Sequence, residues 1–408
     1  MRVGVFHPGS QNVWQRAYAF QESGNLAWLA TSAYFQPQSA PVRAAGWIPG
    51  RTGSRLRAGL LKRWFPPLDP ARVRRMGAME LGEVALRRAG LDGHAHRLNR
   101  WGNVRFGAAV IAQIQREPVD VVWGYNSASL EVFRWAKARG LTCVLDQSIG
   151  HPAAENAVLA AERTRHPDFF APGDTGHDAA WIARNAEELD LADHVVVGSD
   201  AAAATLIANG VDGAKIHIVP YGADERLFPE RPPVRTVPRN RPLNLLFAGA
   251  VGPRKGVQYL LPALARLPES VASLTLVGRL AMPRATFARY AGRVRHVPQV
   301  PRAKMPDHFA RADLFVFPSL FEGGAVVLAE ALGSGLGILQ THAAGTGAAD
   351  GVSGRVLAAP DAEALAETIA AAARSPETVR AWQAAAWRQG RNRRWADFRA
   401  GIRGVPGA

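Results

Sequence analysis

The chain has 408 residues, of which 48% are hydrophobic and 20% charged, so it is long and apolar enough for about two or three folded domains rather than extended disorder. A single cysteine, Cys143, excludes an internal disulfide framework and favours a reducing compartment. No run of about 18 apolar residues occurs, so no membrane-spanning helix is predicted. The chain opens on an apolar segment, 3–6, rather than on a signal peptide, and we expect a cytoplasmic protein.

Short apolar segments alternate with amphipathic ones along the chain. Strands are predicted at 2–7, 119–125 and 142–146, and helices at 14–22 and 130–139. Strands separated by helices favour parallel sheets with crossover connections. We therefore predict the α/β class, built from two doubly wound, Rossmann-like domains.

The formal net charge of +15 is concentrated near the N-terminus. Residues 1–120 contain 17 Lys and Arg against seven Asp and Glu, a surplus of ten. In the segment 51–65, basic residues alternate with Leu, Trp and Phe, which is typical of a helix on an anionic membrane surface. A solvated arginine-rich loop is the next alternative. Nucleic acid is the last, because no nucleic-acid-binding module accompanies the charge.

Two segments repeat the same pattern 120 residues apart. Both 192–199 and 312–319 consist of Ala-Asp, an apolar strand and a terminal Ser, which suggests two domains of one type. Between them, a Pro- and Arg-rich stretch without apolar periodicity predicts a linker. We expect a first domain at 1–228, the linker at 229–242, a second domain at 243–378, and C-terminal helices at 379–408 that pack back toward the first domain.

The second predicted domain opens on a strand followed by a glycine-containing basic loop. Gly249 ends the strand, and Arg254 and Lys255 come just before the next helix. Glycines permit close backbone approach, and cations beside a helix N-terminus attract phosphate. Taken alone, an Arg-Lys pair in a loop is more often a solvated turn.

Two carboxylates follow the strand of the second repeat. Glu322 lies in a glycine-rich turn, and Glu330 lies on the apolar helix that comes next. Eight residues at helical rise span about 12 Å, which is about the length of a nucleotide sugar from ribose to hexose. An isolated pair of acids is more often solvated, but Glu330 has apolar neighbours on both sides.

These motifs, in this order, resemble the retaining glycosyltransferases of family 4, which have the two-domain GT-B fold. The resemblance extends over about residues 190–370 and includes 192–199, Val219-Pro220-Tyr221-Gly222, Gly249 with Lys255, Val277-Gly278, Glu322 with Glu330, and Asp350-Gly351. Each motif is weak alone, and their order makes the set specific. The N-terminal part resembles the family only in its pattern, as expected of a half that binds a variable acceptor.

The resemblance implies a role for each candidate residue. Lys255 and Arg254 would hold the donor diphosphate, Glu322 would contact the donor sugar, and Glu330 would bind the ribose hydroxyls. His151 is a candidate to face the reacting sugar, with a structural loop histidine as an equal alternative. The backbone positions implied to line the donor site are Gly9, Gly249, Gly278, Gly323, Gly324 and Ala325.

The chain departs from the family pattern at two places near the donor. Ala250 stands where many relatives have Arg, so Arg254 or Arg279 would supply that phosphate contact. The residues after Glu322 are Gly-Gly-Ala, and we expect this small sequence to open space beside the sugar.

The resemblance implies transfer from a UDP- or GDP-linked sugar, with no other cofactor, to a glycan or lipid-linked acceptor of bacterial surface polysaccharide such as lipopolysaccharide. No Asp-x-Asp motif or spaced His ligands occur, so we expect no metal site. We expect contact with the inner membrane through 51–65 and no nucleic-acid partner. The alternatives are a nucleotide-sugar epimerase on the same fold and a basic adaptor with a vestigial site.

Overall fold

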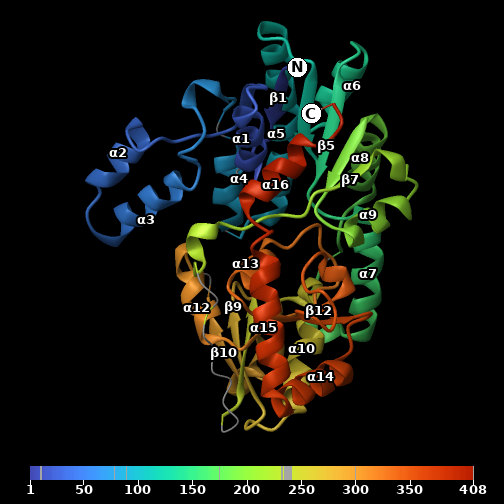
Figure 1. Cartoon of the computed structure of the whole chain (residues 1–408). Helices are drawn as coiled ribbons and strands as arrows, with labels where there is room; N and C mark the ends of the chain where they lie inside the picture. The colour runs from blue at the N-terminus through green and yellow to red at the C-terminus, as the bar shows by residue number, and fades with distance from the viewer. Residues whose placement is uncertain are drawn as a thin grey trace. The chain divides into compact units, whose positions relative to one another are not determined.

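The computed structural model describes residues 1–9, 12–77, 79–88, 90–173, 175–230, 233, 241–298 and 300–407. Most of the predicted linker at 229–242 lies outside this part of the chain. The described residues form two parallel sheets with helices packed on them, which confirms the predicted α/β class (Figure 1).

The first sheet has seven strands in the order β3-β2-β1-β4-β5-β6-β7. They are β1 (Val3–Phe6), β2 (Leu26–Thr31), β3 (Val73–Arg75), β4 (Val121–Tyr125), β5 (Thr142–Gln147), β6 (His194–Val197) and β7 (Ile216–Ile218). The helices that lie between these strands in the chain are α1 (Val13–Glu22), α2 (Ala40–Trp47), α3 (Gly50–Leu61), α4 (Met79–Arg88), α5 (Asp92–Arg116), α6 (Leu130–Lys137), α7 (Pro152–Arg165), α8 (Ala179–Leu191) and α9 (Asp200–Ile207).

The second sheet has six strands in the order β10-β9-β8-β11-β12-β13. They are β8 (Leu243–Ala248), β9 (Ala272–Val277), β10 (Val294–Val297), β11 (Leu314–Phe317), β12 (Gly337–Thr341) and β13 (Gly354–Leu357). The helices that lie between these strands or follow them in the chain are α10 (Val257–Ala265), α11 (Arg284–Ala288), α12 (Met305–Arg311), α13 (Val326–Gly333), α14 (Ala362–Arg374), α15 (Pro376–Gly390) and α16 (Trp395–Arg403).

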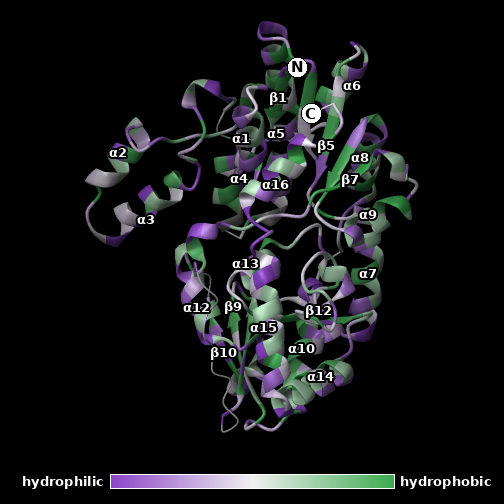
Figure 2. Cartoon of the chain, in the orientation of Figure 1, coloured by the Kyte–Doolittle hydropathy of each residue, from purple (hydrophilic) through white to green (hydrophobic). Residues whose placement is uncertain are grey.

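The central strands are apolar on both faces, as buried parallel strands require. Strand β11 is buried throughout, and so is β1. In Figure 2, β1 has the green colour of hydrophobic residues. The core of the second sheet joins β8 and β11 to apolar residues of α10, α13 and α14. This burial explains why short apolar runs in the sequence predict the strand positions within about two residues.

The chain divides into two compact units. Unit 1 contains residues 1–147, 180–196 and 399–408, and unit 2 contains 148–179 and 197–398. The last residues therefore belong with the N-terminal half, where Arg399 and Arg403 pair with Glu22 at 2.9 and 2.7 Å. The predicted boundaries at 228 and 243 stay a prediction.

In each of the two repeated segments, the Asp carboxylate accepts a hydrogen bond from the backbone of the neighbouring strand. Asp193 accepts a hydrogen bond from the Cys143 amide of β5 (2.8 Å), and Asp313 accepts one from the Asn244 amide of β8 (2.8 Å). Asp313 also pairs with Arg241 at 2.6 Å. The repeated Ala-Asp thus marks the amino end of β6 and of β11.

We predict that Asp313→Ala destabilises the protein by about 2 kcal/mol, because it leaves a strand-end amide and Arg241 without their acceptor. Urea unfolding followed by circular dichroism measures this change. Glu367→Ala, at an exposed site on α14, is the control and stays within about 0.5 kcal/mol. Equal unfolding midpoints for the two variants would contradict this role of Asp313.

Candidate functional site

The candidate site in unit 2 is built by two loops that follow neighbouring strands. Strands β8 and β11 are adjacent and parallel, so their carboxyl ends meet at one edge of the sheet. The loop after β8 carries Arg254 and Lys255 in the 3-10 turn Pro253–Lys255, and the loop after β11 carries Glu322. The sheet order itself therefore brings residues 67 positions apart together.

Backbone contacts hold the two loops together. The Arg254 carbonyl accepts hydrogen bonds from the Leu320 amide (2.9 Å) and the Ser319 hydroxyl (3.1 Å). In return, the Arg254 guanidinium donates to the Phe321 carbonyl at 2.7 Å. These contacts hold both loops in place, so the cations and the carboxylate face each other at fixed positions.

Glu322 is the charged centre of the site. Its side chain is 8% exposed and accepts hydrogen bonds from Lys255 and, at 2.7 Å, from the Ser319 hydroxyl. The Arg254 guanidinium lies 3.4 Å away. Burial alone would raise the pKa of Glu322, but Lys255 and then Arg254 outweigh it and hold this pKa below its ordinary value. Glu322 is therefore a stabilised carboxylate at neutral pH.

Arg254 keeps hydrogen-bonding capacity beyond these contacts. Its side chain is one-third exposed, and a second acid, Glu155 of α7, lies 3.8 Å from its Nε. A guanidinium has five N–H donors, of which one is bonded to Phe321. Arg279, the other substitute proposed for the missing arginine at Ala250, is exposed. Of the two, Arg254 is the one placed at Glu322.

Glu330 lies on α13, within unit 2, and is as buried as Glu322 but has a different partner. It pairs with Arg302 at 2.5 Å, and Arg302 is half-exposed. Burial raises the pKa of Glu330 above its ordinary value, and the attraction of Arg302 offsets this only in part. The two acids of the sequence motif therefore have pKa values displaced in opposite directions.

His151 begins α7 within unit 2. Its ring Nδ1 accepts a hydrogen bond from the Ala153 amide (3.2 Å), and its own amide donates to Thr205 at 2.9 Å. Burial lowers the pKa of His151, so the ring is neutral at neutral pH with Nε2 as its donor. The histidine thus caps its helix and keeps one ring nitrogen available.

The turn after Glu322 does not leave open space. A Cβ on Gly323 would lie 2.0 Å from the Ser148 carbonyl oxygen, and one on Gly324 would lie 3.0 Å from the Gly198 Cα. The Gly323 carbonyl also accepts a hydrogen bond from Ser199 at 2.7 Å. The expectation that this small sequence opens space near the sugar is therefore wrong, because neighbouring backbone fills it.

The remaining predicted positions lie at turns of the two sheets. Gly249 and Gly278 follow β8 and β9, where a Cβ on Gly278 would overlap the Gly249 carbonyl. Ala325 is the N-cap of α13. Gly9 follows β1 in unit 1, where its amide donates to His7 at 3.0 Å. Gly249, Gly278 and Ala325 therefore lie in unit 2, as Glu322 does, whereas Gly9 lies in unit 1.

Glu155 and Arg302 were missed by sequence reasoning. Glu155 lies 99 residues from Arg254, and Arg302 lies 28 residues from Glu330, both outside any motif. A search of the described residues finds no group of acids, histidines and cysteines that could hold a metal ion. In the same part of the chain, no helix is long and apolar enough to cross a membrane.

Comparison with known proteins identifies the family. Residues 242–375 match the family model described as glycosyl transferases group 1. A D-inositol 3-phosphate glycosyltransferase of Catenulispora acidiphila is 30% identical over 308 residues, which cover 67% of this chain and 70% of that protein. The chain belongs to the group 1 glycosyl transferases.

A second relative, of the same name, from Xylanimonas cellulosilytica, is 31% identical over 226 residues, or 50% of this chain and 54% of its own length. Across the relatives with the strongest matches, the chain spans from about half to somewhat under two-thirds of their length.

Solved structures of other proteins share the fold. Sucrose-phosphate synthase from Thermosynechococcus elongatus aligns over 99% of this chain and 98% of its own, with a TM-score of 0.71 and 18% identity. The Anabaena protein HepE in complex with UDP-glucose aligns over the same shares, with a TM-score of 0.61 and 14% identity. These likenesses confirm the predicted GT-B architecture.

We predict that Glu330→Gln raises the thermal midpoint at neutral pH. The pKa of Glu330 in the folded state lies above its ordinary value, so the folded protein loses stability as rising pH ionises this group. The amide cannot ionise and avoids that loss. The difference in thermal midpoint between Glu330→Gln and wild type should therefore become smaller as the pH is lowered from about 8 to about 4.5.

Differential scanning fluorimetry across that pH range measures the effect. Glu367→Gln, on the exposed face of α14, is the matched control and should give no pH-dependent difference. A Glu330→Gln variant that is less stable than wild type at neutral pH would contradict the assigned direction of the pKa shift.

Proposed function

We propose that the chain is a retaining glycosyltransferase that transfers a sugar from a nucleoside diphosphate donor without a metal ion. The observation that supports this most directly is the pairing of Lys255 and Arg254 with a buried Glu322 at the N-terminus of α10. The resemblance in the sequence, the group 1 family and a neighbour crystallised with UDP-glucose point to the same donor class.

The cations suit a departing diphosphate. Transfer breaks the bond between the sugar C1 and the phosphate oxygen, and negative charge builds up on that phosphate. Lys255, the free N–H groups of Arg254 and the amides that begin α10 would stabilise this charge without rearranging. Such fixed donors can do the work that a metal ion does in other transferases.

Glu322 suits a sugar-binding role better than a nucleophilic one. Two cations and the Ser319 hydroxyl stabilise its ionised form, which lowers the reactivity of the carboxylate toward C1. We propose that it accepts hydrogen bonds from donor-sugar hydroxyls and keeps both cations in place. The acceptor hydroxyl would then attack C1 from the side of the leaving group and pass its proton to the departing phosphate oxygen.

Glu330 suits the ribose end of the donor. A carboxylate can accept hydrogen bonds from two neighbouring hydroxyls, and Arg302 would hold it in position. His151, neutral and with Nε2 available, would lie toward the reacting sugar, and the glycine turns would let the donor approach the backbone. The acceptor we propose is a glycan or lipid-linked intermediate of bacterial surface polysaccharide.

UDP, GDP, UDP-glucose and GDP-mannose are screened for the ligand that raises the thermal midpoint of wild type most. Lys255→Ala should abolish this increase, because the stabilisation by a ligand follows its affinity.

Glu322→Gln should reduce sugar transfer by about a hundredfold or more and leave the protein folded. Transfer is measured with radiolabelled donor and a bacterial lipid extract.

Lys304→Ala and Glu367→Gln, both at exposed positions in unit 2, serve as charge-matched controls and should behave as wild type. Turnover like that of wild type in Lys255→Ala and Glu322→Gln would overturn the site. Donor conversion without acceptor would favour the epimerase, and failure to bind any nucleotide would favour the adaptor.

We also propose that the enzyme works at the cytoplasmic face of the inner membrane, bound through the hairpin of α2 and α3. This hairpin stands away from the sheet of unit 1 (Figure 1). Trp47 is 82% exposed at its tip, and Leu56 is exposed beside Arg55 and Arg57. Exposed aromatic and basic residues together are suited to the headgroup region of an anionic bilayer.

The inner end of the predicted segment 51–65 is anchored instead. Arg63 pairs with Glu80 at 2.6 Å, and the Phe65 ring packs edge-on against Tyr18. The proposed surface therefore ends at Lys62. Arg63 is excluded from it because that side chain is engaged within unit 1.

Replacing Arg51, Arg55, Arg57 and Lys62 by Gln should reduce flotation with vesicles that contain phosphatidylglycerol by about tenfold or more, since each cation near such a surface contributes about 1 kcal/mol. The control replaces four exposed arginines of unit 2, Arg266, Arg284, Arg374 and Arg380, by Gln. Equal flotation of both variants would reject the hairpin as the membrane contact.

A further inference from the structure

A pocket separate from the candidate site lies in unit 2 at the amino ends of β8, β9 and β10. Its volume is about 690 Å³, within the range of small-molecule sites. Lys255 and Glu322 follow the carboxyl ends of β8 and β11, so this pocket is at the opposite end of the strands from the donor site. Nothing in the proposed transfer reaction uses it.

The pocket is left beside a short crossover helix. Helices α10 and α14 pack against β9. Helix α12, which connects β10 to β11 and lines the pocket, has only seven residues and packs against β8. Parallel sheets are normally covered on both faces, so an open face here is unusual.

The open face is polar where a buried parallel sheet would be apolar. Asn244 of β8 is in register with Ser273 of β9, and the Ser273 hydroxyl donates to its side-chain oxygen at 3.0 Å. Thr275 of β9 is in register with Arg295 of β10. Registered residues of parallel strands point to the same face, so hydroxyls and a guanidinium line one surface.

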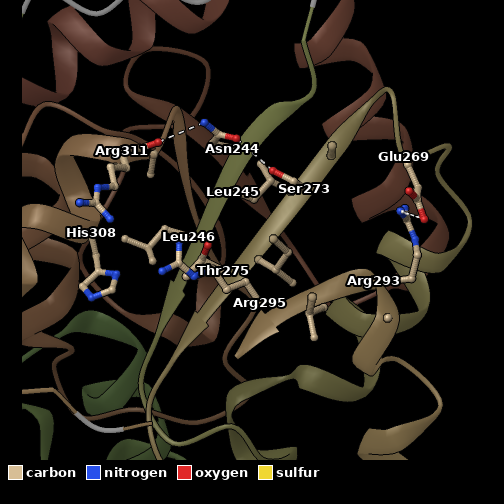
Figure 3. Close-up of a pocket in the computed structure, with 15 residues that line it drawn as sticks. Asn244, Leu245, Leu246, Glu269, Ser273, Thr275, Arg293, Arg295, His308 and Arg311 are labelled. Atoms are coloured by element: carbon tan, nitrogen blue, oxygen red, sulfur yellow. Dashed lines mark hydrogen bonds and ion pairs between the residues drawn. The ribbon is translucent and has the colours of Figure 1, made fainter. Parts of the chain in front are cut away.

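Positive charge gathers at one end of this surface. Figure 3 shows the side chains of Arg295, His308 and Arg311 at that end, and the pair of Arg293 with Glu269 (3.3 Å) at the other. Burial first, and then the charges of Arg295 and Arg311, lower the pKa of His308, while Asp307 opposes them. Among the described residues, no carboxylate forms an ion pair with Arg295 or Arg311.

We propose that this pocket binds a small phosphorylated polyol. Its phosphate would lie between the guanidinium groups of Arg295 and Arg311, which match phosphate oxygens with paired N–H donors. Its hydroxyls would lie along Ser273 and Thr275, with the neutral His308 as a further donor or acceptor. A neutral sugar would leave both guanidinium groups without a partner, so the phosphate provides the main recognition.

Isothermal titration with ribose 5-phosphate, and with ribose as the neutral match, tests this proposal. UDP is present in excess throughout, so that ribose 5-phosphate does not bind at the proposed donor site. Wild type should bind ribose 5-phosphate and show no heat with ribose. Arg295→Gln/Arg311→Gln should weaken binding by about tenfold or more, because two charge-assisted contacts are lost.

Arg284→Gln/Arg374→Gln removes the same charge from exposed sites in unit 2 outside the pocket and should bind as wild type. Equal weakening in both double variants would show a general charge effect and overturn the site. Unchanged affinity in Arg295→Gln/Arg311→Gln would do the same, with its thermal midpoint confirming that the variant is folded. This comparison does not depend on whether the chain transfers sugar.

Discussion

The candidate site of unit 2 depends on the burial of one carboxylate between two cations. A buried, unpaired Glu322 would cost several kcal/mol, and so would a buried, unpaired Lys255. Together they are tolerable only if their loops are held at a fixed separation. The bonds between Arg254 and residues 319–321 supply that rigidity: the Leu320 amide donates to the Arg254 carbonyl without using any charged group, and the Arg254 guanidinium adds a bond to the Phe321 carbonyl. The adjacency of β8 and β11 is what makes such bonds possible.

The two repeated segments show how one sequence pattern can serve packing in one place and chemistry in another. Asp193 and Asp313 have the same task, since each accepts the amide of a neighbouring strand. The serines that end the segments differ. Ser199 caps α9 and bonds the Gly323 carbonyl, whereas Ser319 donates to Glu322. The repeat therefore predicts the scaffold in both halves, but only its context in the chain distinguishes the half that holds the charged site.

Apolar periodicity and glycine positions predicted the features that depend on residues close together in the sequence. The strand at 243–248 and the placement of Glu322 in a loop and Glu330 on a helix follow from apolar periodicity and glycine. The partners Glu155 and Arg302 could not be predicted, because neither is fixed by residues near it in the sequence. The expected space after Glu322 was wrong for the same reason: the Ser148 carbonyl that fills it comes from 175 residues earlier. The segment 148–179 belongs to unit 2, although it precedes β6, and no composition shift marks that change.

The arginines explain why net charge alone predicts so little about function. Arg16 is buried in unit 1 and is paired with Asp146 at 2.6 Å, so its charge is used within the fold. Arg254 is paired but retains free N–H donors, which suits a ligand that arrives and leaves. Arg55, on the α3 surface, faces solvent beside exposed apolar residues. A formal charge of +15 adds these cases together, whereas binding depends on which cations keep donors that the fold itself has not used.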